Sequence, residues 1–344
     1  MDILDTLKQL WSQQQEHWSL VSVKAPEIPV PAGTMEHGKS IEPNSAYVVA
    51  RMRSMSISAT REGWSRFHGA LYSNVTVGLS DGTTTSIQSV IAPDFLRDLD
   101  PNSLQNVLQI DRTIFGPVPS IGTRISFETG VFAVKHADLA SPFLTCLANL
   151  SSVAGVSLLS AAKPFIEPIK QGLELLTGTS SATSLEIALS RELDPPVTGW
   201  FALIRKADVQ PADLSVIPQN FELRYQGKSL GDVPYLLFSI DGVSQRADWA
   251  QIPDLREAWN EFRAAVKEGN RERAEVAAQS FRRRALICPE LLPDHADDLI
   301  QEAEKQFRRI FGDSDRKAAA LTINDTAMTV PPLEDLTVSF RATH

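Results

Sequence analysis

The segment AYVVARMRSMSIS, residues 46–58, sets the pattern for the first half of this 344-residue chain. It is a short run of mixed apolar and polar residues bounded by turn-forming sequence, which is typical of a β-strand. Similar runs follow at FHGALYSNVTVGL (67–79), TTTSIQSVI (83–91) and RISFETGVFAVK (124–135). We therefore predict a mostly antiparallel β-sheet or sandwich over residues 46–138.

One pentapeptide in this region admits two interpretations. Gly78 to Gly82 matches the G-x-S-x-G nucleophile elbow, with Ser80 as the nucleophile. The elbow requires a helix after the serine, whereas the residues that follow, TTTSIQSV, prefer a strand. The Asp81-Gly82 pair also suits a tight hairpin turn, because glycine and aspartate tolerate positive φ. We expect a hairpin at this position and no catalytic centre.

The longest uncharged run of the chain extends from Leu139 to Ala162. It is long enough to cross a membrane, but Asn149 and the flanking prolines weaken that interpretation. Its main apolar stripe has helical spacing, and the chain should break between Lys163 and Pro168. Residues 139–176 are thus predicted to form a central, buried, kinked helix pair, with partner interface and membrane insertion as alternatives. Three apolar residues lie off the main stripe and form the candidate partner interface: Val153, Val156 and Leu159.

The second half of the chain begins with another β-rich segment and changes to helical periodicity beyond Ile252. We predict a helical hairpin that breaks at Gly269-Asn270, followed by one helix from Asp294 to Phe311. The fold class is therefore α+β, with regions 1–45, 46–178 and 184–344. The apolar positions that support the hairpin are Leu255, Trp259, Phe262 and Val266 in its first helix, and Val276, Ala277, Ser280 and Phe281 in its second.

Residues 257–290 resemble one tetratricopeptide unit. Two helices meet near Gly269, Ala277 and Phe281 are four apart, and Pro289 follows eight residues later. Ala264-Ala265 stand where that repeat has Leu-Gly. The resemblance implies a packed helical hairpin whose exposed faces dock a partner.

Composition argues against several chemistries. The formal net charge of -9 disfavours nonspecific nucleic-acid binding, and the basic cluster Arg282 to Arg284 is interpreted as a solvated helix face. Cys146 and Cys288 are far apart in apolar surroundings, so neither a disulfide framework nor a zinc site is expected. His295 lies beside Asp294, Asp297 and Asp298, but these carboxylates better fit the start of a helix than a metal site. We predict no metal, no cofactor and no catalytic residue.

The loop GWSRFHG, residues 63–69, is the candidate ligand-binding segment. Trp64, Arg66 and His68 could recognise rings or carboxylates. The alternative is a turn whose aromatic residues pack into the core of the sheet. Of the two, the sequence favours the structural turn.

The N-terminal region is expected to form a short amphipathic helix and a Pro-rich linker, residues 1–45, without a secretory signal. These features predict a cytoplasmic, non-catalytic binding protein: an adaptor, scaffold or regulatory subunit with protein partners. One alternative is a membrane-active effector that releases residues 139–176. Another is a hydrolase with a dispersed site, for which Ser80 and Cys288 are the nominated nucleophiles. The sequence sets no oligomeric state.

Overall fold

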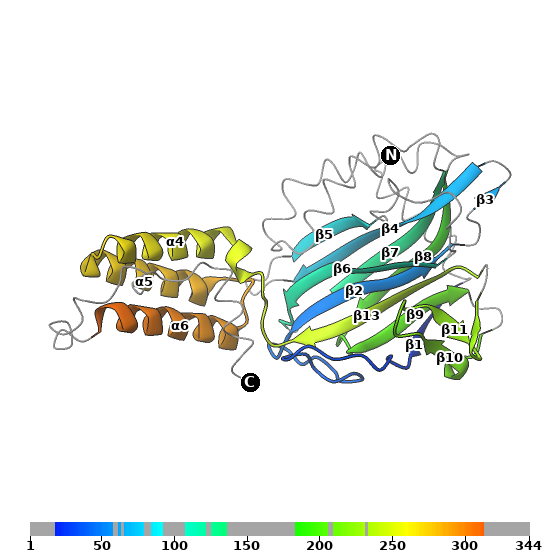
Figure 1. The fold of residues 1–344 in the computed structure, drawn as a ribbon, viewed down its shortest axis with the longest axis horizontal. Helices are drawn as coiled ribbons and strands as arrows, with labels where there is room; N and C mark the ends of the chain where they lie inside the picture. Colours follow the sequence, from blue (N-terminus) through cyan, green and yellow to red (C-terminus); the bar gives the residue numbers. More distant parts are fainter. Residues whose placement is uncertain are drawn as a thin grey trace. The chain divides into compact units, whose positions relative to one another are not determined.

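A computed structural model describes residues 18–57, 61–62, 65–78, 84–91, 107–121, 125–135, 183–205, 209–230 and 233–312. Over these residues the protein is mixed α and β, with antiparallel sheets and three α-helices, as predicted. The chain divides into two compact units, Met1–Val243 and Ser244–His344. Figure 1 shows the strands of the first unit and the helices of the second.

The β-rich runs identified in the sequence form strands in the first unit. Gly78 at the end of one strand pairs with Thr84 at the start of the next, which confirms the predicted hairpin. In chain order the strands are β1 (Trp18–Val23), β2 (Tyr47–Ser56), β3 (Arg61–Glu62), β4 (Ser65–Gly78), β5 (Thr84–Ile91), β6 (Val107–Pro119), β7 (Ile125–Lys135), β8 (Thr183–Leu193), β9 (Gly199–Arg205), β10 (Leu214–Val216), β11 (Leu223–Tyr225), β12 (Lys228–Ser229) and β13 (Tyr235–Val243).

These strands form three sheets in the described part of the chain. The first sheet has the order β1-β9-β13-β2-β6, and the second has the order β3-β4-β7-β8 with β5 paired to β4. A small third sheet has the order β10-β11-β12. Because β13 lies between β9 and β2, both β-rich segments of the sequence contribute to one sheet. The predicted division between regions 46–178 and 184–344 therefore does not follow the sheets, since strand pairing is non-local.

The first two sheets pack face to face as a sandwich. Phe127 of β7 lies 5.8 Å from Phe115 of β6 and 5.7 Å from Phe238 of β13, measured between ring centroids. All three rings are buried, and they belong to one apolar cluster that draws on both sheets. Apolar burial of this kind is the main driving force for folding. We call the side of the first sheet that meets the second sheet its inner face.

The outer face of the first sheet has its own apolar cover. Trp200 of β9 and Tyr235 of β13 are buried there beneath Phe221 and Leu223, which lie in or beside the small sheet. The Leu223 backbone N–H donates to the Tyr235 hydroxyl at 3.2 Å. Burial raises the pKa of Tyr235 to about 12. This cover leaves the neighbouring part of the outer face, on β2 and β13, for the polar groups described below.

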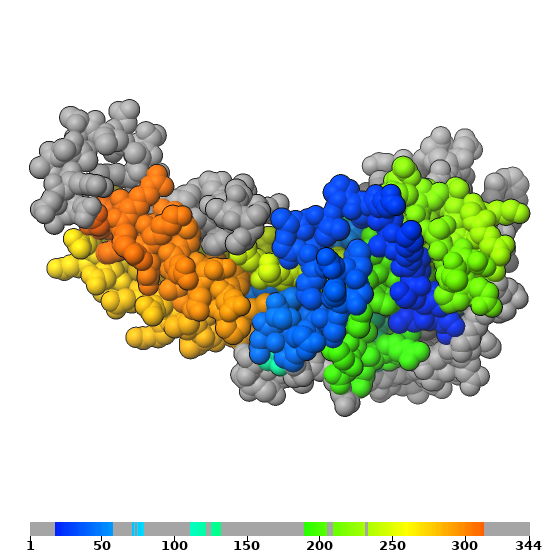
Figure 2. Space-filling model, turned by 90° about the horizontal axis from the view of Figure 1, so that it is seen from below, coloured from blue at the N-terminus to red at the C-terminus, as the bar shows by residue number. Residues whose placement is uncertain are grey.

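The segment after β1 is part of the first unit rather than a free linker. β1 pairs with β9, and backbone N–H groups of Met35 and Ile41 donate to Gly242 and Pro196. The side chains of Met35 and Ile41 pack against Gly242 and join the inner apolar cluster. Figure 2 shows the N-terminal residues, in blue, lying across one face of this unit. Prolines favour an extended chain here, but apolar contacts hold it against the sheet. The predicted helix before Trp18 lies outside the described residues.

The second unit confirms the predicted helical hairpin and third helix. α4 is Pro253–Lys267, and the chain turns just after it at Gly269, whose φ is +67°. α5 (Arg271–Ile287) is capped by the Asn270 side chain, which accepts from the Arg273 N–H at 2.9 Å. α6 is Pro293–Phe311. Short 3₁₀ turns lie at η3 (Pro211–Asp213) in the first unit and η4 (Trp249–Gln251) in the second.

One residue of the predicted hairpin core is misplaced. Val276 is 67% exposed, whereas Ala277 and Phe281 are buried as expected. The buried stripe of α5 is Ala274, Ala277, Phe281 and Ala285, and Val276 precedes Ala277 by about 100° of helix rotation. Apolar character alone therefore assigned Val276 to the wrong face.

Several predictions fall outside the described residues. They include the kinked helix pair over 139–176, with Val153, Val156 and Leu159, and the tail after Gly312. None of the helices that the structure describes has the length and apolarity needed to span a membrane.

Candidate functional site

A β-bulge in β2 interrupts the alternation of side chains between the two faces of the first sheet. Met52 and Met55 both point into the inner core, so two residues, Arg53 and Ser54, fall between them where a regular strand has one. The pairing with β13 confirms this, because Leu237 pairs with Ser54 and Phe238 pairs with Met52, which leaves Arg53 as the extra residue. The bulge therefore leaves Arg53 and Ser54 together on the outer face, where Arg53 lies over Trp200 and Ser54 donates to the Phe221 backbone oxygen.

β6 carries a matching irregularity opposite Arg53. Met52 pairs with Arg112 and Ser54 pairs with Gln109, so two β6 residues lie across from Arg53. One of them, Asp111, has a φ of +41°, a conformation that aspartate tolerates better than most residues. This backbone places the Asp111 carboxylate against the Arg53 guanidinium. Bulges often re-aim side chains beside functional sites, which makes this region the candidate site.

Arg53 is held on every side. Its Nη1 donates to Asp111 Oδ1 at 2.6 Å, its Nε donates to Ser239 Oγ at 3.1 Å, and its Nη2 reaches Asp241 Oδ2 at 3.5 Å. The guanidinium also lies over two aromatic rings, 4.8 Å from the centroid of Trp200 and 5.7 Å from that of Phe221. Its side chain is only 11% exposed. These contacts fix the position of Arg53, and Arg53 in turn holds the carboxylates of Asp111 and Asp241 in place.

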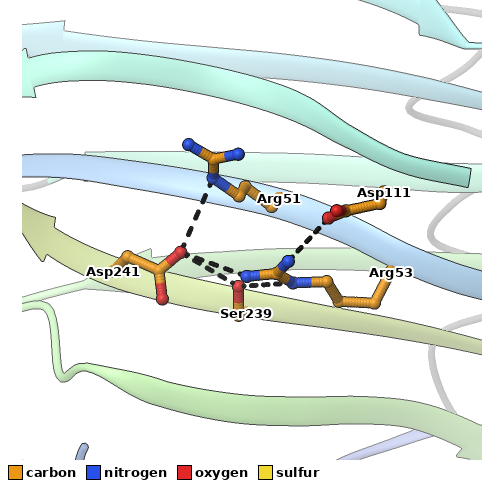
Figure 3. A network of polar contacts seen from close by, with 5 residues as sticks. All are labelled: Arg51, Arg53, Asp111, Ser239 and Asp241. Atoms are coloured by element: carbon orange, nitrogen blue, oxygen red, sulfur yellow. Dashed lines mark hydrogen bonds and ion pairs between the residues drawn. The ribbon is translucent and has the colours of Figure 1, made fainter. Parts of the chain in front are cut away.

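Arg51 lies two residues before Arg53 on β2, one full strand period away, and is more accessible than Arg53. Its Nε is 3.8 Å from Asp241 Oδ2, and its side chain is 44% exposed. Its two terminal amino groups make no hydrogen bond to any residue that the structure describes, and Figure 3 shows them pointing away from Asp241. Asp241 is itself fixed, because its Oδ2 also accepts from Ser239 Oγ at 3.2 Å. Asp241 thus holds the guanidinium of Arg51 at Nε, and the two terminal amino groups face away from the network.

The network of Arg51, Arg53, Asp111, Ser239 and Asp241 is balanced in charge. Two guanidinium groups face two carboxylates. The most exposed members are Arg51, at 44%, and Asp111, at 45%. Opposite charges at these distances offset the cost of desolvating Arg53 and Asp241. The arrangement suits the recognition of a planar, hydrogen-bonding group by Arg51.

A second ionic cluster lies in the helical unit and is mostly buried. The Arg246 side chain is 1% exposed and donates to Asp248 through Nε at 2.8 Å and Nη2 at 2.9 Å. Its Nη1 donates to the Glu290 carboxylate at 3.0 Å and to the Glu290 backbone oxygen at 3.2 Å. These bonds join the segment before η4 to the segment between α5 and α6. The cluster is a structural element, since solvent hardly reaches its Arg246–Glu290 pair.

Two residues singled out in the sequence lie beside this buried cluster. Burial, together with the positive charge of Arg246, lowers the pKa of His295 to about 4. Burial also raises the pKa of the Cys288 thiol to about 11, so the thiol is protonated and weakly nucleophilic near neutral pH. His295 is therefore a buried, neutral residue at the start of α6. Among the residues that the structure describes, no group of three or more His, Cys, Asp or Glu side chains could hold a metal ion.

α5 carries an exposed surface of apolar and basic side chains. Val276, Leu286 and Ile287 are 67%, 57% and 72% exposed, and Arg282 and Arg283 lie between them in sequence. Arg282 is 60% exposed and pairs with Glu304 at 3.4 Å. We call Val276, Arg283, Leu286 and Ile287 the α5 face. Arg282 and Arg283 are exposed, as predicted, whereas Arg284 is 30% exposed and pairs with Glu257. Apolar side chains accompany the exposed arginines.

The predicted ligand-binding residues fall only partly within the described structure. Arg66 and His68 lie in β4, where their backbones pair with Arg61 and Val134, and Trp64 lies outside the described residues. Ser80 also lies outside them, between β4 and β5. No catalytic geometry is assigned to any of these residues.

The sequence contains a signal for the bulge that strand periodicity alone missed. In ARMRSMSI, residues 50–57, apolar Ala50 and Met52 alternate with polar residues, and Met55 and Ile57 alternate in the opposite phase. The change of phase falls at Arg53-Ser54, where two polar residues are adjacent. The aspartate partners leave no such signal, because Asp241 is 188 residues away from Arg53.

Comparison with known proteins gives no family. No family model, no curated protein and no solved structure matches this chain.

Proposed function

We propose that this chain is a non-catalytic cytoplasmic binding protein, an adaptor, scaffold or regulatory subunit of a multi-protein assembly. The observation that carries the proposal is the α5 face. Among the described residues, five large apolar side chains are exposed, and three of them, Val276, Leu286 and Ile287, lie on this one helix. A grouping of apolar residues on a helix surface is typical of a protein interaction site.

The spacing along α5 places residues of the α5 face on one side of the helix, where a single partner can contact them. Val276, Arg283 and Ile287 are seven and four residues apart, so they share one side of the helix, away from the buried stripe through Ala277 and Phe281. Arginine is enriched in protein interfaces because its guanidinium both packs and donates hydrogen bonds. The α5 face therefore offers apolar contact with a polar centre to a protein partner.

The test is a double substitution at the most exposed end of this face. Leu286→Asp with Ile287→Asp should abolish recovery of co-purifying proteins from cells that express a tagged full-length chain. Val30→Asp is the matched control, since Val30 is an exposed valine, 52% accessible, in the first unit. Circular dichroism checks that both variants fold. Recovery of the same proteins with the double variant and with the control contradicts the proposal.

A second candidate function is that of a membrane-active effector that uses residues 139–176. Strand register favours it, because Val134 of β7 pairs with Thr183 of β8, so the two strand ends that bound residues 136–182 lie side by side. The pairing of β7 with β8 does not require the long connection between them. In a liposome flotation assay the full chain should float, whereas a variant with residues 136–182 replaced by Asn-Gly should not. Equal behaviour of the two proteins rejects this candidate.

A further inference from the structure

The polar network in the first unit has a geometry that a purely structural ion pair does not need. Arg53 by itself contacts both carboxylates, those of Asp111 and Asp241. Arg51 adds a second guanidinium that reaches Asp241 only through Nε, at 3.8 Å. Its two terminal amino groups point away from Asp241, as Figure 3 shows.

The geometry points to Arg51 as a binding site for a single carboxylate group. A guanidinium recognises a carboxylate through two parallel N–H donors, and such pairing is most effective when the arginine is already positioned. Asp241 holds the Nε edge of Arg51, and Arg53 and Ser239 in turn hold Asp241. The outer edge of the fork is then oriented toward solvent without a partner among the described residues.

Charge selects a carboxylate over a dianion. The network contains two arginines and two aspartates, so its formal charge is zero before a ligand binds. A singly charged carboxylate adds one negative charge beside Asp111 and Asp241, whereas a phosphate dianion adds two. The chain as a whole has a formal net charge of -9, which also disfavours highly charged anions. The ligand is thus a carboxylate, from either a small acid or an acidic protein segment.

This site lies in the first compact unit, whereas the α5 face lies in the second, so the inference goes beyond the proposed function and does not rest on it. Loss of partner recovery in the Leu286→Asp and Ile287→Asp variant says nothing about Arg51. Conversely, failure of the carboxylate test leaves the α5 proposal intact.

The experiment is an NMR titration of the isotope-labelled full chain that follows the backbone amides of Ser239 and Asp241. Acetate should produce a saturable shift of both signals, acetamide should produce none, and inorganic phosphate should produce a smaller shift than acetate at equal ionic strength. Arg51→Lys, which keeps the charge but removes the fork, should abolish the acetate shift. Arg191→Lys, an exposed arginine of β8, should leave it unchanged.

Three outcomes overturn the inference. They are an acetate shift that does not saturate, an equal shift in the Arg51→Lys variant, and a larger response to phosphate than to acetate. If acetate binds as expected, a glutamate-rich peptide and its glutamine counterpart then distinguish the sources. Tighter binding of the glutamate peptide than of acetate assigns the site to a protein segment, and equal binding assigns it to a small acid.

Discussion

Arg53 in the first sheet and Arg246 ahead of α4 each hold two carboxylates, but at different depths. The partners of Arg246 are 14% and 0% exposed, whereas those of Arg53 are 45% and 11% exposed. Breaking an enclosed pair leaves a charge that water cannot reach, and near the surface water replaces the lost partner. The comparison separates an ionic cluster that stabilises its unit from one that also presents a group to solvent.

The strongest test of this difference is removal of Arg246. Arg246→Gln leaves Glu290 and Asp248 without their guanidinium partner, so we expect the second unit to lose about 3–5 kcal/mol of unfolding free energy. Urea unfolding followed through the fluorescence of Trp249 and Trp259 measures the loss, because both indoles are buried in that unit. Arg282→Gln, at a 60% exposed ion pair, should change stability little. Similar effects of the two substitutions would remove the distinction between the clusters.

Acidification should destabilise the enclosed cluster through His295. Its pKa is about 4 when folded and about 6.5 when unfolded, so the unfolded chain takes up the proton first as pH falls. Stability is then unaffected by this group above about pH 6.5 and decreases by about 3 kcal/mol between pH 6.5 and 4. Urea midpoints measured across this range should fall more steeply for the natural chain than for His295→Gln. Parallel curves contradict the assignment of a buried, neutral imidazole.

Removal of Arg53 should have an intermediate effect. Arg53→Gln leaves Asp241 mostly buried without its closest guanidinium and also removes the contact with Trp200, so we expect a loss of about 1–3 kcal/mol. Differential scanning calorimetry of the first-unit transition measures this loss. A loss as large as that for Arg246→Gln means that the network is as enclosed as the buried cluster.

The smallest effect is expected at Arg51. Because its side chain is 44% exposed, Arg51→Gln should cost less than about 1 kcal/mol of stability. The same calorimetric transition measures it, with Arg53→Gln as the comparison. A loss equal to that of Arg53→Gln indicates that Arg51 is structural and weakens the assignment of a ligand site.

The sequence predicted local structure well where one element buries its own periodic face. Trp259 and Phe262 in α4, and Leu299 and Ala303 in α6, are buried at the helical spacing that identified them. Strand order was not predictable, because nothing near Tyr235–Val243 indicates that this strand inserts between β9 and β2. The pairing depends on which apolar faces fit across the whole sandwich, and no local pattern encodes that choice.

The candidate site was missed for a related reason. Arg51 and Arg53 stand in a segment that was correctly assigned to a strand, but strict alternation does not anticipate a bulge at Arg53-Ser54. Asp111 adopts positive φ in the part of β6 that lies opposite this bulge. The loop around Trp64 was favoured instead because its aromatic and basic residues are neighbours in sequence, whereas the residues of the network converge only in the fold.

Chemical modification of arginines in the native protein tests the central distinction most directly. Phenylglyoxal treatment of the folded chain, followed by peptide mass spectrometry, reports which guanidinium groups are accessible. Arg51 should be modified in the native protein, whereas Arg53 and Arg246 should react only after denaturation. Protection of Arg51 in the folded chain, or modification of Arg246 at the same rate as Arg51, would contradict the account.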